Sequence, residues 1–204
     1  LKLNGKHHIP MWYFSFLWYN KDKENQFMKI CAIIGNGFEE LEAIGSIALL
    51  KRSGIEVDIY SLEKDIVLGK HNIAITNVLP LKQCQEKDYD MLLLPGGPHY
   101  EQLENNVYVI ELIHNFYQKK KGIAAICAAP TILGKMGLLQ NRNYTCFTSM
   151  NEDFKGTYLD QYVVKDDFII TARSAAASID FAFEIIEYLQ GKEQRTKSEE
   201  QIYY

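Results

Sequence analysis

The chain has 204 residues, of which 47% are hydrophobic and 24% are charged, and its formal net charge is −4 at pH 7. These values are typical of one soluble globular domain with a substantial core. No basic face stands out, so the composition argues against a nucleic-acid-binding protein. The aromatic run at 11–20 is too short to span a bilayer, so we expect no membrane partner.

Three regions are expected along the chain. Met28 introduces the first convincing strand, and residues 1–27 are interpreted as an N-terminal extension, because no small-residue cleavage site follows their aromatic run. An α/β domain is expected over 28–192. The polar segment 193–204 is expected to be a mobile tail.

The pattern of apolar residues predicts strands that alternate with helices. Continuous apolar runs predict buried strands, and apolar residues at helical spacing predict helices that end near Gly54 and Gly191. In chain order, the prediction is strand 28–35, helix 36–54, strands 55–62, 73–76 and 89–94, helix 101–121, strand 122–126, helix 129–137, strand 142–147, hairpin 160–173 and helix 174–191. This order predicts one doubly wound α/β domain, with a mostly parallel sheet covered by helices on both faces.

Three chemically interesting stretches fall at the carboxyl ends of predicted strands. They are the turn after 28–35, the Pro-Gly-Gly after 90–94, and Cys127 after 122–126. Ligands of doubly wound sheets bind in the crevice beyond these strand ends. We therefore expect the three stretches to converge on one site.

Cys127 lies where a strand meets a helix, between small residues that permit a sharp turn. Amide N–H groups at the helix start, such as that of Ala128, favour a thiolate and can hold an oxyanion. The arrangement is similar to the nucleophile elbow of hydrolases. The alternative is a buried cysteine that only fills the turn.

Carboxylates and glycines supply the other candidates for this site. Glu39, Glu40 and Glu42 fall in the first turn of a predicted helix, where they either complement the helix dipole or direct one carboxylate into the crevice. Gly96 and Gly97 end a buried strand and can present N–H groups to an anion, or form a plain turn. His99 is a candidate base, although a single loop histidine is more often on the surface.

The four cysteines are far apart in the sequence and form no CxxC pattern, and the histidines lack metal-ligand spacing. We therefore expect no metal and no cofactor, with reduced thiols in a cytoplasmic protein. Cys146 lies on the predicted strand after the Cys127 helix, where it is a candidate resolving thiol. Cys31 and Cys84 are interpreted as fillers of the core or surface.

Five stretches, taken together and in this order, resemble the ThiJ/PfpI superfamily, in particular the branch of the Parkinsonism-associated deglycase and its bacterial relatives. The resemblance covers about residues 28–192. It rests on "GFEELEAI" (37–44), "LKRSGIEV" (50–57), "YDMLLLPGG" (89–97), "AAICAAPTILGKMGLL" (124–139) and "TARSAAASIDFAFEIIEYLQGK" (171–192). It implies a flavodoxin-like sandwich of the glutamine-amidotransferase-like type, and a homodimer.

The resemblance also implies roles for individual residues. Cys127 matches the reactive, oxidation-sensitive cysteine, and Glu42 matches the acid that is hydrogen bonded to it. Gly96 and Gly97 match glycines whose amides face the cysteine. The remaining positions that line the site are Glu39, His71 (where some members have arginine), His99, Arg173 (the arginine before the last helix) and Phe147.

Departures from the family pattern bear on the chemistry. Phe147 stands about where some members carry a histidine, so a Cys-His pair is not evident. "SAAAS" replaces a glycine-rich stretch after Arg173, and His99 and Tyr100 stand where small residues are common.

The leading hypothesis is a glyoxalase or deglycase-like stress protein that acts through Cys127 and Glu42 on small reactive aldehydes such as methylglyoxal, or on glycated adducts. The alternatives are a redox sensor that acts through oxidation of its own Cys127, a chaperone dimer, a cysteine peptidase of the PfpI type, and a relative of the proteins named for thiazole biosynthesis.

Overall fold

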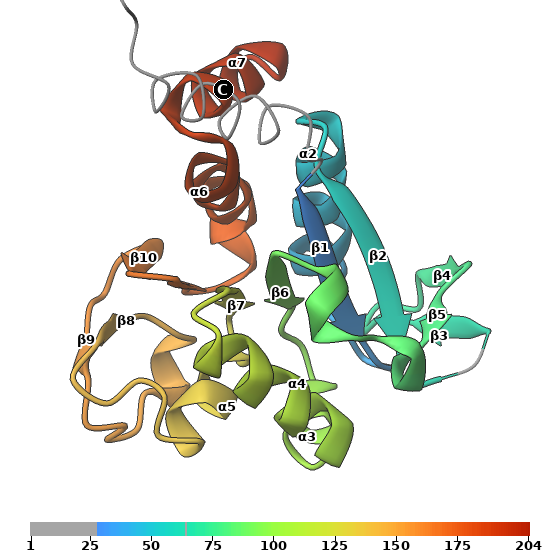
Figure 1. Cartoon of the computed structure of the whole chain (residues 1–204), viewed down its shortest axis with the longest axis vertical. Helices are drawn as coiled ribbons and strands as arrows, with labels where there is room; N and C mark the ends of the chain where they lie inside the picture. Colours follow the sequence, from blue (N-terminus) through green and yellow to red (C-terminus); the bar gives the residue numbers. More distant parts are fainter. Residues whose placement is uncertain (1–27, 64) are drawn as a thin grey trace, which may run out of the picture.

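The computed structural model describes residues 28–63 and 65–204, and residues 1–27 lie outside this description. Seven strands form the central sheet in the order β10-β11-β7-β6-β1-β2-β5 (Figure 1). Neighbouring strands are parallel, except for the antiparallel pair of β10 and β11 at one edge. In sheet order the strands are β10 (Val163–Asp166), β11 (Ile169–Ala172), β7 (Gly122–Ile126), β6 (Met91–Leu94), β1 (Lys29–Ile34), β2 (Glu56–Ser61) and β5 (Leu79–Pro80).

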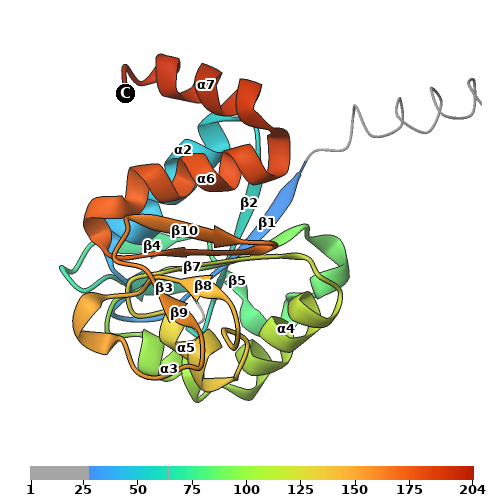
Figure 2. The ribbon, with the colours of Figure 1, turned by 90° about the vertical axis from the view of Figure 1, so that its left-hand side faces the viewer.

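Helices cover both faces of the sheet, as the alternation of elements predicts. Figure 2 shows α2 and α6 on one side, and α3, α4 and α5 on the other. The helices are α2 (Ser46–Arg52), α3 (Tyr100–Glu104), α4 (Val107–Gln118), α5 (Pro130–Lys135), α6 (Ser178–Gln190) and α7 (Lys192–Gln201), with single helical turns at η2 (Leu81–Gln83), η3 (Glu86–Asp88), η4 (Thr148–Met150) and η5 (Ala175–Ala177). The predicted fold class is therefore confirmed.

Alternate residues of β1 point to the two faces and enter separate parts of the core. Ile30 and Ala32 pack toward α2 and α6, whereas Cys31 and Ile33 pack toward α4. The near-continuous apolar strands are thus explained by burial of both faces, as is usual in parallel sheets.

Two small sheets lie outside the central one. The hairpin of β3 (Ile66–Leu68) and β4 (Ala74–Thr76) is joined to the site region by a bridge between Phe38 and Gly69. The second pairs β8 (Asn143–Tyr144) with β9 (Thr157–Tyr158). The strand predicted over 142–147 is therefore reduced to two residues, and it does not join the central sheet.

Other expectations needed correction. The helix predicted over 101–121 is two helices, because the Asn106 side chain caps α4 by accepting hydrogen bonds from the Tyr108 and Val109 amides.

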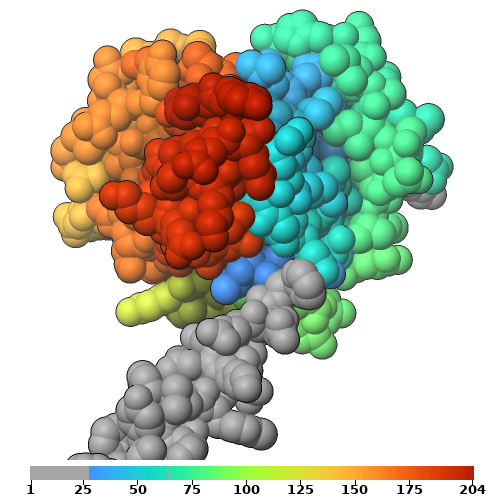
Figure 3. Space-filling model, turned by 90° about the horizontal axis from the view of Figure 1, so that it is seen from above, coloured from blue at the N-terminus to red at the C-terminus, as the bar shows by residue number. Residues whose placement is uncertain are grey.

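The mobile tail expected after residue 192 is instead a helix, α7. Arg195 pairs with Glu184 and Glu187 of α6, and these contacts were not visible in the polar composition. Figure 3 shows α6 and α7 in red beside α2 in cyan on the outer surface.

Within the part of the chain that the structure describes, no helix combines the length and the apolar character that crossing a membrane requires.

Candidate functional site

Cys127 occupies a strained turn between β7 and α5. Its φ is +64°, a left-handed conformation that costs a residue with a side chain about 1–2 kcal/mol. Neighbouring segments hold it there, since its N–H donates to the Ala172 carbonyl at 2.8 Å and its carbonyl accepts from the Phe147 N–H at 2.8 Å. The half-buried thiol is thus fixed by the backbone at the carboxyl end of the sheet, as the sequence predicts for a nucleophile elbow.

Glu42 lies close to this cysteine, and both side chains adjoin Gly96. Glu42 belongs to a single π-helical turn, Leu41–Gly45 (η1), that precedes α2 and was not visible in the sequence pattern. Glu42 is fully buried, and its Oε2 accepts a hydrogen bond from the Gly96 N–H at 2.8 Å. The Cys127 side chain also adjoins Gly96, beside this carboxyl group. One extra residue in a helical turn redirects side chains, and such turns are frequent at functional sites.

Burial sets the protonation of this pair. It raises the pKa of Glu42 to about 7, although the neighbouring Cys127 thiol acts in the opposite direction. Burial also raises the pKa of the Cys127 thiol, and the negative charge of Glu42 raises it further. The thiolate expected from the helix start is therefore not favoured while Glu42 is charged, because the Ala128 amide only partly offsets these effects. Near neutral pH the thiol therefore keeps its proton, and Glu42 is the group that titrates.

Glycine at position 96 allows the acid and the thiol to approach each other. A Cβ there would lie 2.5 Å from Glu42 Oε2 and 2.8 Å from the Cys127 Cβ. Gly97 has a φ of +103°, and its own Cβ would lie 2.5 Å from the Glu39 amide nitrogen. Both glycines are therefore required by close packing.

The amides differ from the arrangement that the sequence suggests. The Gly96 N–H is taken up by the Glu42 carboxylate, and the Gly96 carbonyl accepts from the Glu39 N–H at 2.9 Å. The Ala128 amide acts to lower the pKa of the Cys127 thiol, against the larger effect of burial. Of these two amides, it is therefore that of Ala128 that favours the charged form of the thiol.

His99 is not the surface residue or base that the sequence allows. It is fully buried, its Nδ1 accepts from the Gly35 N–H at 3.0 Å, and its Nε2 donates to the Pro95 carbonyl at 2.9 Å. Burial lowers its pKa to about 4, so the ring stays neutral near pH 7. His99 holds the Pro-Gly-Gly turn in place, and the expectation of a loop histidine on the surface is wrong.

His71 is brought to the acidic helix start by the β3–β4 hairpin. Its backbone N–H and its Nδ1 are bonded to the two oxygens of Glu40, at 2.6 and 2.9 Å. Ligand atoms of Glu39, Glu40 and His71 all lie within 4.8 Å of one another. The sequence spacing gave no sign of this group, because a hairpin rather than a helix brings its members together.

Arg173 and Phe147 adjoin Cys127 through the backbone. Arg173 directly follows Ala172, whose carbonyl accepts the hydrogen bond from the Cys127 N–H. The Arg173 guanidinium, however, pairs with Asp160 at 2.7 Å and lies over the Tyr162 ring. The sequence did not single out Asp160 or Tyr162. The Phe147 side chain is 43% exposed, at a position where some relatives were expected to carry a histidine.

Cys146 is fully buried, its thiol donates to the Phe147 carbonyl at 3.6 Å, and burial raises its pKa to about 11. It is a free thiol that packs in the α4-side core rather than opening to the surface.

The chain is similar in sequence to several known proteins. The chain is 32% identical to deglycase PfpI of Pyrococcus furiosus, over 72% of this chain and 90% of the relative. It is 32% identical to the glutathione-independent glyoxalase DJR-1.2 of Caenorhabditis elegans, over 76% of this chain and 84% of the relative. It is 33% identical to protein dj-1beta of Drosophila melanogaster, over 79% of this chain and 89% of the relative.

The crystal structure of Drosophila DJ-1beta matches this fold with a TM-score of 0.81 at 30% identity, and the match covers 87% of this chain and 98% of the other. Residues 28–188, which include Glu42, Gly96 and Cys127, match the DJ-1/PfpI family. The chain therefore belongs to the DJ-1/PfpI family.

Proposed function

We propose that this protein is a glyoxalase or deglycase-type stress enzyme that acts on small reactive aldehydes such as methylglyoxal, or on their adducts. The observation that carries the proposal is the buried Glu42 carboxyl group, which accepts a hydrogen bond from the Gly96 amide and lies beside the Cys127 side chain. Relatives named deglycase and glyoxalase support the same chemistry.

The proposed reaction starts when the Cys127 sulfur attacks the aldehyde carbon. A C–S bond forms, and the Glu42 carboxylate accepts the thiol proton and passes it to the former carbonyl oxygen, which becomes a hydroxyl group. Glu42 then removes the proton of the attacked carbon and passes it to the neighbouring carbonyl oxygen, which gives an enediol. In a second transfer the proton of the first hydroxyl group moves, through Glu42, to the neighbouring carbon, and this gives the thioester of a hydroxyacid. Water cleaves the thioester, and this step releases the hydroxyacid and restores the thiol.

The test is the rate of methylglyoxal loss in the Cys127→Ser variant. We expect turnover to disappear, because a hydroxyl group is a much weaker nucleophile than a thiol. Cys146→Ser is the matched control, since Cys146 is also a free cysteine but packs in the core. Undiminished turnover in Cys127→Ser would overturn the proposal.

A redox sensor is the second candidate. Cys127 is half-buried, whereas the other three cysteines are buried, so it is the thiol most open to peroxide. Intact-mass analysis after mild peroxide separates the two functions. Addition of two oxygen atoms at Cys127 in a protein without aldehyde turnover favours the sensor.

We also propose a cytoplasmic homodimer. The four free cysteines suit a reducing compartment. Exposed apolar side chains near the site support self-association, and they belong to η1, the β3–β4 hairpin and the start of α6: Leu41, Ile44, Ile66, Leu68, Ile73 and Ile179. Light scattering coupled to size-exclusion chromatography tests this, and a mass that stays monomeric at high concentration would contradict it.

A further inference from the structure

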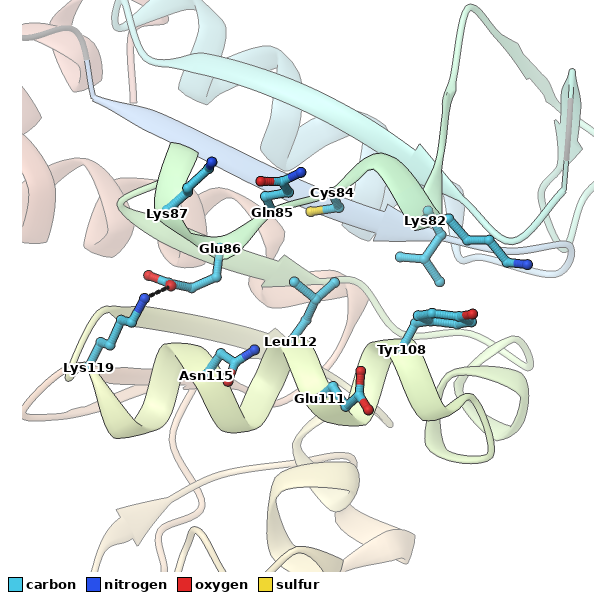
Figure 4. Close-up of a pocket in the computed structure, with 11 residues that line it drawn as sticks. Lys82, Cys84, Gln85, Glu86, Lys87, Tyr108, Glu111, Leu112, Asn115 and Lys119 are labelled. Carbon is cyan, nitrogen blue, oxygen red and sulfur yellow. Dashed lines mark hydrogen bonds and ion pairs between the residues drawn. The ribbon is translucent and has the colours of Figure 1, made fainter.

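Glu42 differs from the buried Glu86 in what stabilises its charge. Glu86 pairs with Lys119, and Figure 4 shows this ion pair beside a cavity of about 390 Å³ between the segment 81–87 and α4. Within residues 28–63 and 65–204, no ion pair joins Glu42 to a basic side chain, and its carboxyl group accepts a hydrogen bond from the Gly96 N–H at 2.8 Å. A buried carboxylate without a counter-charge depends on such a hydrogen bond. The orientation of the Gly96 amide is therefore important for the acid.

The Gly96 N–H belongs to the peptide group that joins Pro95 to Gly96. The oxygen of the same peptide group, the Pro95 carbonyl, accepts a hydrogen bond from the His99 Nε2 at 2.9 Å. The described residues contain no cis peptide bond, and in a planar trans peptide the C=O and N–H groups point in opposite directions. His99 and Glu42 therefore hold the two ends of one rigid peptide group.

The other nitrogen of the His99 ring fixes its tautomer. Nδ1 accepts a hydrogen bond from the Gly35 N–H at 3.0 Å, so in the neutral ring the hydrogen is on Nε2, where it is donated to the Pro95 carbonyl. The ring is fully buried, and burial lowers its pKa to about 4. The ring therefore remains a neutral donor to this carbonyl at the pH values at which Glu42 titrates.

Gly35 gives the ring a second connection to the acid. It follows the last residue of β1, and residues 35–40 lead into η1, which carries Glu42. Pro95 follows the last residue of β6, which pairs with β1 in the sheet. One ring thus ties the strand end that leads to Glu42 to the strand end that supplies its amide donor.

We propose that His99 is a positioning residue for Glu42: its ring orients and polarises the Pro95–Gly96 peptide group, whose N–H holds the carboxylate beside Cys127. A hydrogen bond to the oxygen of a peptide group makes its N–H a stronger donor, because hydrogen bonds in a chain polarise one another. The effect of His99 on turnover rests on the proposed function, whereas its effect on the ionisation of Glu42 does not.

Two substitutions separate the two hydrogen bonds of the ring. In His99→Gln, the side-chain nitrogen reaches about as far as Nε2 and can donate to the Pro95 carbonyl, but the acceptor for Gly35 is lost. In His99→Asn, the side-chain oxygen reaches about as far as Nδ1 and can accept from the Gly35 N–H, but the Pro95 carbonyl loses its donor. Gln102→Ala is the matched control, because the Gln102 side chain, also on α3, donates to the Asn36 carbonyl at 3.0 Å in the same turn after β1.

Infrared spectroscopy against pH measures the ionisation of Glu42 directly, since the C=O band of its protonated carboxyl group is the band missing from Glu42→Gln. We expect the midpoint, about 7 in the unsubstituted protein, to rise by about one pH unit in His99→Asn, because the Gly96 N–H favours the charged form. It should not change in His99→Gln or Gln102→Ala. An unchanged midpoint in His99→Asn would overturn the proposal. A fall toward 4.5 would also overturn it, because the ring would then only keep water away from the acid.

The unsubstituted protein supplies a test that does not depend on the folding of a variant. NMR of isotope-labelled protein follows the His99 Nε2–H signal as the pH changes. We expect this signal to shift with a midpoint of about 7, the pKa of the buried Glu42, because the two residues share one peptide group. A signal that stays constant through this midpoint would overturn the proposal.

Turnover connects the proposal with the chemistry of the site. The other groups that act on the ionisation of Glu42 are Cys127, Glu39 and Lys70, and the three variants leave them in place. We expect kcat for methylglyoxal to fall about 10-fold in His99→Asn with little change in KM, because the acid rather than the substrate is misplaced. Undiminished kcat in His99→Asn would overturn the positioning role. Undiminished turnover in Cys127→Ser would overturn the proposed function instead, and the infrared and NMR measurements would still decide the role of His99.

Discussion

The Glu42 carboxyl group and the Gly96 amide are joined by a hydrogen bond of 2.8 Å that ties the π-helical turn to the Pro-Gly-Gly turn. This bond uses Oε2 of Glu42, while Oε1 is buried without a hydrogen-bond partner among the described residues. The Cys127 side chain lies beside the same carboxyl group, at Gly96. The bond therefore fixes where the acid sits and leaves part of it free to exchange a proton with the thiol.

Glu42→Gln should separate thiol reactivity from turnover. The amide keeps a hydrogen-bonding group but removes the negative charge that raises the pKa of Cys127 beyond the effect of burial. We expect the midpoint of Cys127 alkylation against pH to fall by about one pH unit. Methylglyoxal turnover should fall about 100-fold or more, because no carboxylate remains to move the proton.

In the unsubstituted protein, methylglyoxal turnover should rise with pH through about 7, as Glu42 loses its proton. An alkylation midpoint that moves upward in Glu42→Gln would contradict this account of the charge coupling.

Gly96→Ala should disrupt the site without unfolding the protein. The added Cβ would lie 2.5 Å from Glu42 Oε2 and 2.8 Å from both the Cys127 Cβ and the Ile126 carbonyl, so the acid and thiol must move apart. A misplacement of about 1 Å can lower turnover about 100-fold. The matched control is Gly45→Ala, which meets no atom within 4 Å.

We expect the control to keep its activity and to gain about 0.5 to 1 kcal/mol of stability, because alanine is favoured over glycine in helices. Kinetics and urea unfolding of both variants give the two measurements. Full activity in Gly96→Ala would show that the close approach is not needed.

The sequence allowed prediction of the parallel sheet and of the elbow at Cys127, because both depend on local signals. Buried strands read as apolar runs, and the strand-to-helix seam is marked by small residues and Pro130. Glu42 was singled out only through the resemblance, since three nearby glutamates look equivalent in sequence. Their separation into different environments depends on the π-helical turn, which shifts the helical register locally.

Long-range contacts were the features that could not be predicted. His99 is buried because its ring is hydrogen bonded both to Gly35, at the end of β1, and to Pro95, at the end of β6. The segment expected to be a mobile tail is the helix α7, because Arg195 forms ion pairs with two glutamates of α6. Nothing in the local composition of either segment encodes these partners.

The left-handed conformation of Cys127 should reverse the usual ranking of alanine and glycine. At a φ of +64°, a side chain is strained, whereas glycine is not. We therefore expect Cys127→Gly to be more stable than Cys127→Ala by about 0.5 to 1 kcal/mol, after allowance for the greater freedom of glycine in the unfolded chain. Urea unfolding of the pair measures this difference.

Ala124→Gly in the middle of β7 is the control, because its backbone is ordinary strand and the substitution should be destabilising. If Cys127→Gly were the less stable of the pair at position 127, strain at the elbow would not contribute to stability.

Glu42 and Glu40 should have opposite effects on stability as pH changes. The folded state raises the pKa of Glu42 from 4.5 in the unfolded chain to about 7. The favourable contribution of Glu42 to the free energy of unfolding is therefore present below pH 4.5 and is lost as pH rises through about 7. The shift corresponds to roughly 3 kcal/mol at alkaline pH. Glu42→Gln should therefore become more stable relative to the unsubstituted protein as pH increases from 5 to 8.

Glu40 provides the matched comparison. Burial favours its neutral form, but hydrogen bonds from His71 and Ile73 outweigh burial and leave its pKa lowered. Its contribution is therefore present above the unfolded pKa of 4.5 and is lost as pH falls, so Glu40→Gln should be destabilised at neutral pH and less so in acid. Urea unfolding of both variants from about pH 3 to 8 gives the two trends, with the change for Glu40→Gln below pH 4.5 and that for Glu42→Gln above it. Parallel trends would show that the two carboxyl groups do not occupy different electrostatic environments.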